Sequence, residues 1–82
     1  METSLSVYPN PTVASLTLKI VDYKDDNLSY KMFDLKGNMI ISQSINAAET
    51  LIDMKELPAA VYFISIVDKK DLLKTFRVIK GQ

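Results

Sequence analysis

The sequence contains no cysteine and no histidine. Without cysteine, the chain has no disulfide, no thiolate metal site and no thiol nucleophile. Without histidine, it lacks the commonest general base, the commonest metal ligand and every Ser-His-Asp arrangement. Tryptophan is also absent, and two glycines and three prolines are too few for a low-complexity segment. These absences remove most routes to catalysis and leave a chain that folds by burying apolar side chains.

The remaining catalytic groups do not form a recognisable set. A serine nucleophile without histidine needs a lysine as its base, and no Ser-x-x-Lys spacing occurs in the chain. The carboxylates of Asp34, Asp53 and Glu56 lie at expected loop edges. The core of so short a chain leaves little room for the cleft that a catalytic carboxylate pair needs. We therefore expect no enzymatic activity and no cofactor.

One acidic segment offers the oxygen ligands that hard cations prefer. It consists of Asp22, Asp25, Asp26 and Asn27. It lacks the central glycine and the final glutamate of an EF-hand loop. We interpret it as a solvated turn and expect no metal site.

The formal net charge is zero, so no overall field attracts nucleic acid and none is expected as a partner. The charges are unevenly distributed: residues 69–82 carry five positive side chains and one negative, a net +4 that balances −4 on residues 1–68. This basic segment is either a solvated strand whose lysines protect a sheet edge or a recognition surface. No apolar run is long enough for membrane insertion, and the first residues lack the features of a signal peptide. An export signal is therefore expected on a preceding part of a longer protein.

Apolar and polar residues alternate along most of the chain, which is typical of half-buried strands. Turn-forming residues separate these runs at short intervals. Length and pattern predict one domain, residues 1–82 with a core of about 4–80. We expect it to be all-β, an immunoglobulin-like antiparallel β-sandwich of about seven strands: 4–8, 13–21, 28–34, 39–45, 49–53, 61–67 and 72–80.

Two stretches need separate interpretation. Both alternate sets of residues in 61–67 are largely apolar, which predicts a central strand covered on both faces. Residues 47–57 are the one helix candidate, but β-branched and turn residues interrupt the helical spacing. A strand and a turn are favoured there.

Three short segments have the composition of turns. In Tyr8-Pro9-Asn10-Pro11, each proline fixes its own φ and restricts the residue before it, which predicts a stiff corner. The pair Gly37-Asn38, shortly after Asp34, predicts a hairpin with a positive φ at the glycine. Pro58-Ala59 predicts a turn just before the strand at 61–67.

In their order and spacing, these segments resemble the C-terminal sorting domain, type A, of type IX secretion, also called Por secretion. The resemblance covers about residues 5–80 and depends on a basic final strand and on the motif residues Tyr8, Pro9, Asn10, Pro11, Asp34, Gly37, Pro58 and Tyr62. The chain departs from the family pattern at Ala60, where a glycine usually stands two residues before the tyrosine. If that glycine serves a positive φ, the alanine costs about 1 kcal/mol.

The resemblance implies a secretion and sorting signal of Bacteroidetes-type Gram-negative bacteria. Such a domain directs a covalently attached N-terminal cargo protein through the periplasm and the outer-membrane translocon. A surface sortase then removes the domain, and the cargo stays at the cell surface or is secreted. The implied partners are the translocon components, the sortase and the cargo.

We hypothesise that the last strand is the element that the translocon recognises, through Lys74, Arg77, Val78 and Lys80, with the three basic side chains directed outward. An exposed edge strand also predicts pairing between two copies, and hence a dimer. The alternative is a carbohydrate-binding or adhesion β-sandwich module of a secreted protein. That alternative needs a row of exposed aromatic side chains.

Overall fold

The computed structural model describes residues 4–12, 14–21, 27–69 and 71–81. Within these ranges there are seven strands and no helix. The strands are β1 (Ser4–Tyr8), β2 (Ser15–Val21), β3 (Leu28–Phe33), β4 (Met39–Ser44), β5 (Glu49–Asp53), β6 (Ala60–Asp68) and β7 (Asp71–Lys80). The all-β prediction and the number of strands are confirmed, and each predicted boundary lies within one or two residues of the observed one. The helix candidate at 47–57 contains β5 and a turn instead.

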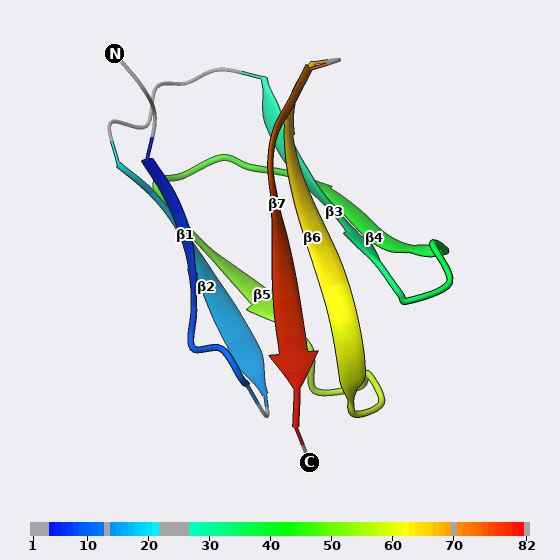
Figure 1. Ribbon diagram of the computed structural model, residues 1–82. Coiled ribbons are helices and arrows are strands. Elements are labelled where there is room, and N and C mark those ends of the chain that lie inside the picture. The colour runs from blue at the N-terminus through cyan, green and yellow to red at the C-terminus, as the bar shows by residue number, and fades with distance from the viewer. Residues whose placement is uncertain (1–3, 13, 22–26, 70, 82) are drawn as a thin grey trace.

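The strands form two antiparallel sheets that face each other (Figure 1). The smaller sheet has three strands in the order β1-β2-β5, and the larger has four in the order β4-β3-β6-β7. Four strands are therefore sheet edges: β1 and β5 in one sheet, β4 and β7 in the other. This arrangement confirms the predicted β-sandwich.

The order of strands is immunoglobulin-like, with one change in the position of the fourth strand. Lettered A to G along the chain, the sheets are A-B-E and D-C-F-G. In immunoglobulin constant domains the fourth strand pairs beside E, in the other sheet. Here β4 returns antiparallel to β3 after a tight turn, so it widens the larger sheet beyond the width of the smaller one.

The core lies between the sheets and is made by alternate residues of each inner strand. Leu16 and Leu18 of β2 are fully buried, as are Ile64 and Ile66 of β6. The intervening residues face outward, so the period of two in the sequence determines which side chains enter the core.

The prediction that β6 is covered on both faces is wrong, and the prediction for the acidic segment stays untested. Strand β6 is central, between β3 and β7, but it is not covered on both faces, because its outward residues Val61, Phe63, Ser65 and Val67 are half-buried rather than buried. The acidic segment at Asp22, Asp25 and Asp26 lies outside the described residues, so its interpretation as a solvated turn remains a prediction. No helix in the described part of the chain has the length and apolar character needed to cross a membrane.

Candidate recognition site

The candidate recognition strand, β7, lies at the edge of the four-stranded sheet, and the corner at Asn10 closes part of that edge. The side-chain amide of Asn10 donates to the backbone oxygen of Arg77 at 2.9 Å. Its oxygen accepts the backbone N–H of Ile79 at 2.9 Å. The amide group of Asn10 therefore pairs with β7 as a neighbouring peptide group would, across 67 residues of sequence.

Thr12 extends this pairing toward the end of the strand. Its backbone N–H donates to the backbone oxygen of Ile79 at 2.9 Å, and its backbone oxygen accepts the N–H of Gly81 at 2.6 Å. Its hydroxyl donates to the backbone oxygen of Ser15 at 2.7 Å and accepts from the N–H of Ala14 at 3.3 Å. Thr12 is buried, with an exposed fraction of 3%. It connects the start of β2 to the end of β7, and no sequence signal singled it out.

The edge of β7 therefore has two different halves. Residues 77–81 are covered by Asn10 and Thr12. Because the backbone groups of alternate residues point the same way in an antiparallel strand, those of Thr75 also point away from β6. Within the described residues, no backbone partner reaches this first half. A register shift opposite Ile66 and Val67 leaves Leu73 unopposed, so the open half also contains a β-bulge.

The four residues proposed for recognition occupy different environments. Lys74 and Arg77 are exposed. Val78 is fully buried in the core, and Lys80 has an exposed fraction of only 7%. The expectation that all three basic side chains point outward is wrong, because Lys74 and Lys80 share the inward parity of Val78 on an alternating strand, while Arg77 lies on the outer face. Lys74 is exposed although it lies on the inner face, whereas Lys80 is buried. The ammonium group of Lys80 reaches the backbone oxygen of Gly81 at 3.3 Å.

Lys74 is held against an aromatic ring. Its ammonium group lies 5.0 Å from the ring centroid of Phe76, the half-buried residue two positions along the same strand. A cation at this distance over an aromatic face is attracted to the ring, by about 0.5–1 kcal/mol at exposed sites. The interaction orients Lys74 along the open half of β7.

The Asp34 carboxylate determines the shape of the β3–β4 turn. One carboxylate oxygen accepts the backbone N–H groups of Lys36 and Asn38, each at 2.9 Å, and the other accepts the Asn38 amide at 3.2 Å. These hydrogen bonds favour the ionised form, with that from the Asn38 backbone the strongest cause, and lower the pKa of Asp34 although desolvation opposes the shift. The backbone N–H of Gly37 donates to the backbone oxygen of Asp34 at 3.0 Å, and Gly37 has the expected positive φ, 87°. The turn is centred on residues 35–36, two positions earlier than the predicted pair Gly37-Asn38.

Tyr62 and Pro58 make a tyrosine corner at the start of β6. The Tyr62 hydroxyl donates to the backbone oxygen of Pro58 at 2.7 Å, and the ring is buried, with an exposed fraction of 3%. In immunoglobulin-like folds a tyrosine near the start of the sixth strand makes this bond to the backbone a few residues upstream. Ala60, the departure from the family pattern, has no positive φ, because the described residues with positive φ are Gly37 and Lys69. The cost expected for this alanine is therefore not incurred.

The three motif turns lie at the same end of the sandwich, where β7 ends (Figure 1). Strand pairs β1–β2, β3–β4 and β5–β6 all turn at this end. Tyr8, Pro9 and Pro11 are exposed around Asn10, and the peptide bonds before both prolines are cis. The motif residues thus act as turn and corner residues, and two of them, Asn10 and Tyr62, make hydrogen bonds that fix the β7 edge and the β6 start.

The structure gives no platform for a glycan among the described residues. Tyr8 is the exposed aromatic there, with an exposed fraction of 43%, and the other described aromatic side chains are buried or half-buried. Tyr23 lies outside the described residues. In the same part of the chain no three acidic side chains come together as a metal site would require.

The comparisons with known proteins agree with this geometry. A family model described as a secretion system C-terminal sorting domain matches residues 6–80. A search of curated proteins gave no match. The chain belongs to the C-terminal sorting domains of type IX secretion. Membership implies interaction with the secretion machinery and a cargo, and export to the cell surface or into the medium.

Proposed function

We propose that this domain directs an attached cargo protein through the type IX outer-membrane translocon by presenting the first half of β7. One observation supports this assignment most strongly. The basic end of the chain forms an edge strand whose second half is covered by Asn10 and Thr12. The backbone groups of its first half, beside Lys74, have no partner among the residues that the structure describes. An edge of this kind can accept a strand from a partner, with charged side chains providing selectivity.

The four proposed recognition residues then divide into two roles. Lys74 and Arg77 are exposed and contact the translocon. Val78 and Lys80 are buried and hold the end of β7 in the sandwich. The domain itself performs no reaction and uses no cofactor.

The rest of the route follows from the sorting role. The cargo lies N-terminal to the domain and carries the signal by which the whole protein enters the periplasm. The sorting domain folds there and is recognised by the translocon. A surface sortase removes the domain, and the cargo is either attached to a lipopolysaccharide anchor or released. Pairing of two open β7 edges would give a dimer before the translocon is met, and the repulsion of the two basic strands would limit it.

The test uses a reporter fused to the N-terminus of this chain in a Bacteroidetes host with a type IX translocon. Deletion of residues 74–82 should abolish surface delivery, and the double substitution Lys74→Glu, Arg77→Glu should reduce it at least tenfold with little change in Tm. The matched control is Lys19→Glu, Lys55→Glu, which reverses two exposed charges outside β7. Surface delivery that is equal for both double variants would refute recognition through β7.

A further inference from the structure

The larger sheet extends past the smaller one on the side opposite β7, and this leaves the inner face of β4 uncovered. Five of the six residues of β4 are exposed, and Ile41 is half-buried. Gln43 pairs with the buried Tyr30, so it lies on the inner face of the sheet, yet it is exposed. A core-facing position that remains exposed shows that no layer covers it.

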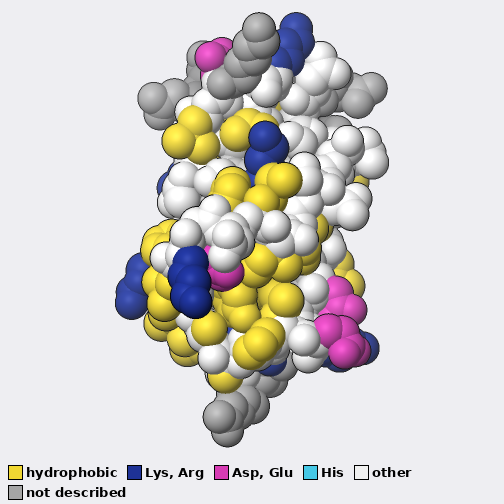
Figure 2. Space-filling view, turned by 90° about the vertical axis from the view of Figure 1, so that its right-hand side faces the viewer, with side chains coloured by type: hydrophobic (Ala, Val, Ile, Leu, Met, Phe, Trp, Pro, Cys, Tyr) yellow, Lys and Arg dark blue, Asp and Glu magenta, His cyan; other side chains and the backbone are white. Residues whose placement is uncertain are grey.

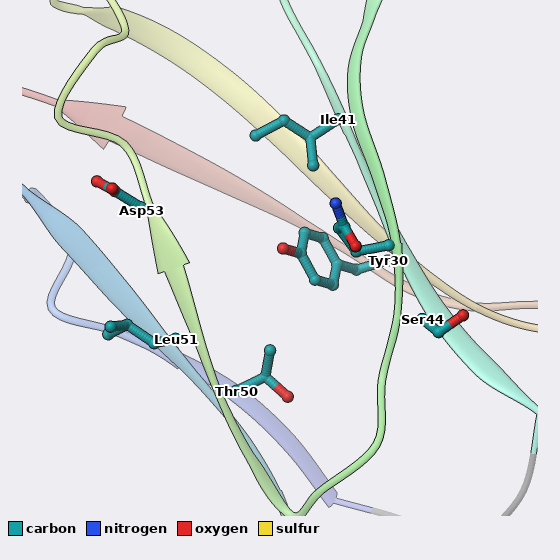
Figure 3. Close-up of a pocket in the computed structure, with 7 residues that line it drawn as sticks. Tyr30, Ile41, Ser44, Thr50, Leu51 and Asp53 are labelled. Carbon is teal, nitrogen blue, oxygen red and sulfur yellow. The ribbon is translucent and has the colours of Figure 1, made fainter.

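A cavity of about 460 Å³ lies between β4 and β5 at this place (Figure 3). We call it the β4–β5 groove, and it is lined by Tyr30, Ile41, Gln43, Ser44, Thr50, Leu51 and Asp53. Figure 2 faces this side of the molecule and shows apolar side chains gathered over its lower half. Leu35, Met39 and Ile40 of the β3–β4 hairpin are exposed there, with exposed fractions of 66%, 57% and 38%.

The hydroxyl of Tyr30 points into the β4–β5 groove without a hydrogen-bond partner in the described part of the chain (Figure 3). The side chain has an exposed fraction of only 6%, and burial raises its pKa above the ordinary value. The hydroxyl itself is open to solvent in the groove, because no fully buried side-chain oxygen or nitrogen in the described part of the chain lacks a partner. Tyr62, the other buried tyrosine, does have a partner, which makes Tyr30 the exception.

One wall of the β4–β5 groove is an unpaired strand edge. The bonds from Ile20 to Ala48 and from Met54 to Ala14, each 2.8 Å, lie at the two ends of the β2–β5 ladder. Alternation then directs the backbone N–H and C=O groups of the even-numbered residues of β5 toward β2, and those of the odd-numbered residues away from it. The backbone groups of Glu49, Leu51 and Asp53 therefore face outward, and no described segment pairs with them. Leu51 has an exposed fraction of 69%, which a neighbouring strand would reduce.

We propose that the β4–β5 groove accepts an extended segment of a partner protein as a fourth strand beside β5. The added strand would make the two sheets equal in width and cover Ile41 and Gln43. On the outer face, the side chains of the added strand beside Glu49, Leu51 and Asp53 would be basic, apolar and basic. The basic side chain beside Asp53 is favoured most, because Glu49 already lies opposite Lys19 of β2. The two intervening side chains would point inward, and a polar atom of one would bond the Tyr30 hydroxyl.

The experiment places the photoreactive residue p-benzoylphenylalanine at position 43, in the groove, or at position 19, on the outer face of β2. The reporter fusion and the translocon-bearing host are those used to test the proposed function. We expect an adduct from position 43 that maps to one contiguous partner segment with the basic-apolar-basic pattern, and none from position 19. Leu51→Pro, which removes an outward N–H from an edge strand, should abolish the adduct, whereas Leu51→Ala should keep it.

Tyr30→Phe provides a second test that does not depend on a proline being tolerated. It removes a hydroxyl that has no hydrogen-bond partner among the described residues, so it should leave Tm unchanged while reducing the adduct at least threefold. An adduct that is insensitive to both Leu51→Pro and Tyr30→Phe, an adduct to a glycan or to a second copy of the chain, or no adduct from an exported reporter would overturn the inference. An adduct that depends on Leu51 and Tyr30, found together with surface delivery that the β7 substitutions do not reduce, would overturn the proposed function alone.

Discussion

The two sides of the sandwich where the sheets end differ in how their edge strands are covered. On the side of β1 and β7, Asn10 and Thr12 cover the second half of β7 and connect it to the start of β2. On the side of β4 and β5, no described segment covers either edge, and a cavity remains between the strands. The motif residue Asn10, together with Thr12, closes part of the first side, and no motif residue covers an edge on the second. The comparison shows that the residues of the family pattern mainly stabilise the β7 side of the sandwich and the end where β7 terminates.

The largest expected effect is a difference in stability loss between the core, which lies between the two sheets, and β4, which the smaller sheet does not cover. Ile64→Ala removes a fully buried side chain, so we expect a loss of about 2–5 kcal/mol, enough to unfold much of so small a domain. Ile41→Ala changes the same residue type in the same sheet, but its side chain is half-buried beside the cavity, so we expect a loss of about 1 kcal/mol. Urea unfolding measures both. Equal losses would show that β4 is covered in solution.

The next effect tests the covering of β7. Asn10→Ala removes two hydrogen bonds to the strand, and we expect a loss of about 1–2 kcal/mol. Amide exchange at Ile79 should become at least tenfold faster. Asn46→Ala, at an exposed loop position, is the control and should change stability by less than about 0.5 kcal/mol. Unchanged exchange at Ile79 in the Asn10 variant would contradict the pairing.

A smaller effect compares the two buried tyrosines. Tyr62→Phe breaks the bond to Pro58 and leaves that backbone oxygen unpaired, so we expect a loss of about 1 kcal/mol. Tyr30→Phe breaks no hydrogen bond to a described residue and should be neutral or slightly stabilising. Thermal unfolding of the two variants side by side gives the difference. A loss at Tyr30 as large as that at Tyr62 would mean that the Tyr30 hydroxyl has a partner in solution.

The smallest effect concerns pH. The folded-state pKa of Asp34 is lowered, so its contribution to stability is present above the unfolded pKa and disappears as the pH falls through the folded value. Tm measured between pH 5 and pH 2 should therefore decline more for the natural sequence than for Asp34→Asn. Added salt screens the attraction between this exposed carboxylate and Lys36 but leaves the hydrogen bonds to the backbone in place, so part of the decline should persist at high salt. Parallel curves for the two proteins would show that the turn does not depend on the ionised carboxylate.

Much of the fold could be predicted from local pattern. The period of two along residues 15–21 and 28–33 identified the strands and their buried faces, because a strand side chain can point to only two faces. The turn residues at Gly37 and Pro58 gave the strand ends. The prediction that residues 61–67 are covered on both faces was wrong, because an apolar outward residue in a small sandwich is only half-buried where no further layer exists.

The candidate site was predicted less completely. The basic strand β7 and the importance of Asn10 could be predicted from the sequence. The burial of Lys80 follows from its parity with Val78, but a lysine is rarely buried and its charge suggested the opposite orientation. Thr12 carries no motif, and its role depends on pairing with a strand far away in sequence.

The sequence by itself determined the strands, the turns and the family, because each depends on residues that are close together along the chain. The tertiary structure alone decided which strands became edges and which edges were covered. Pairing between distant strands depends on how the two sheets meet. In the described part of the chain, four strands over three leave β4 and β5 without a neighbour of the kind that Asn10 and Thr12 give to β7.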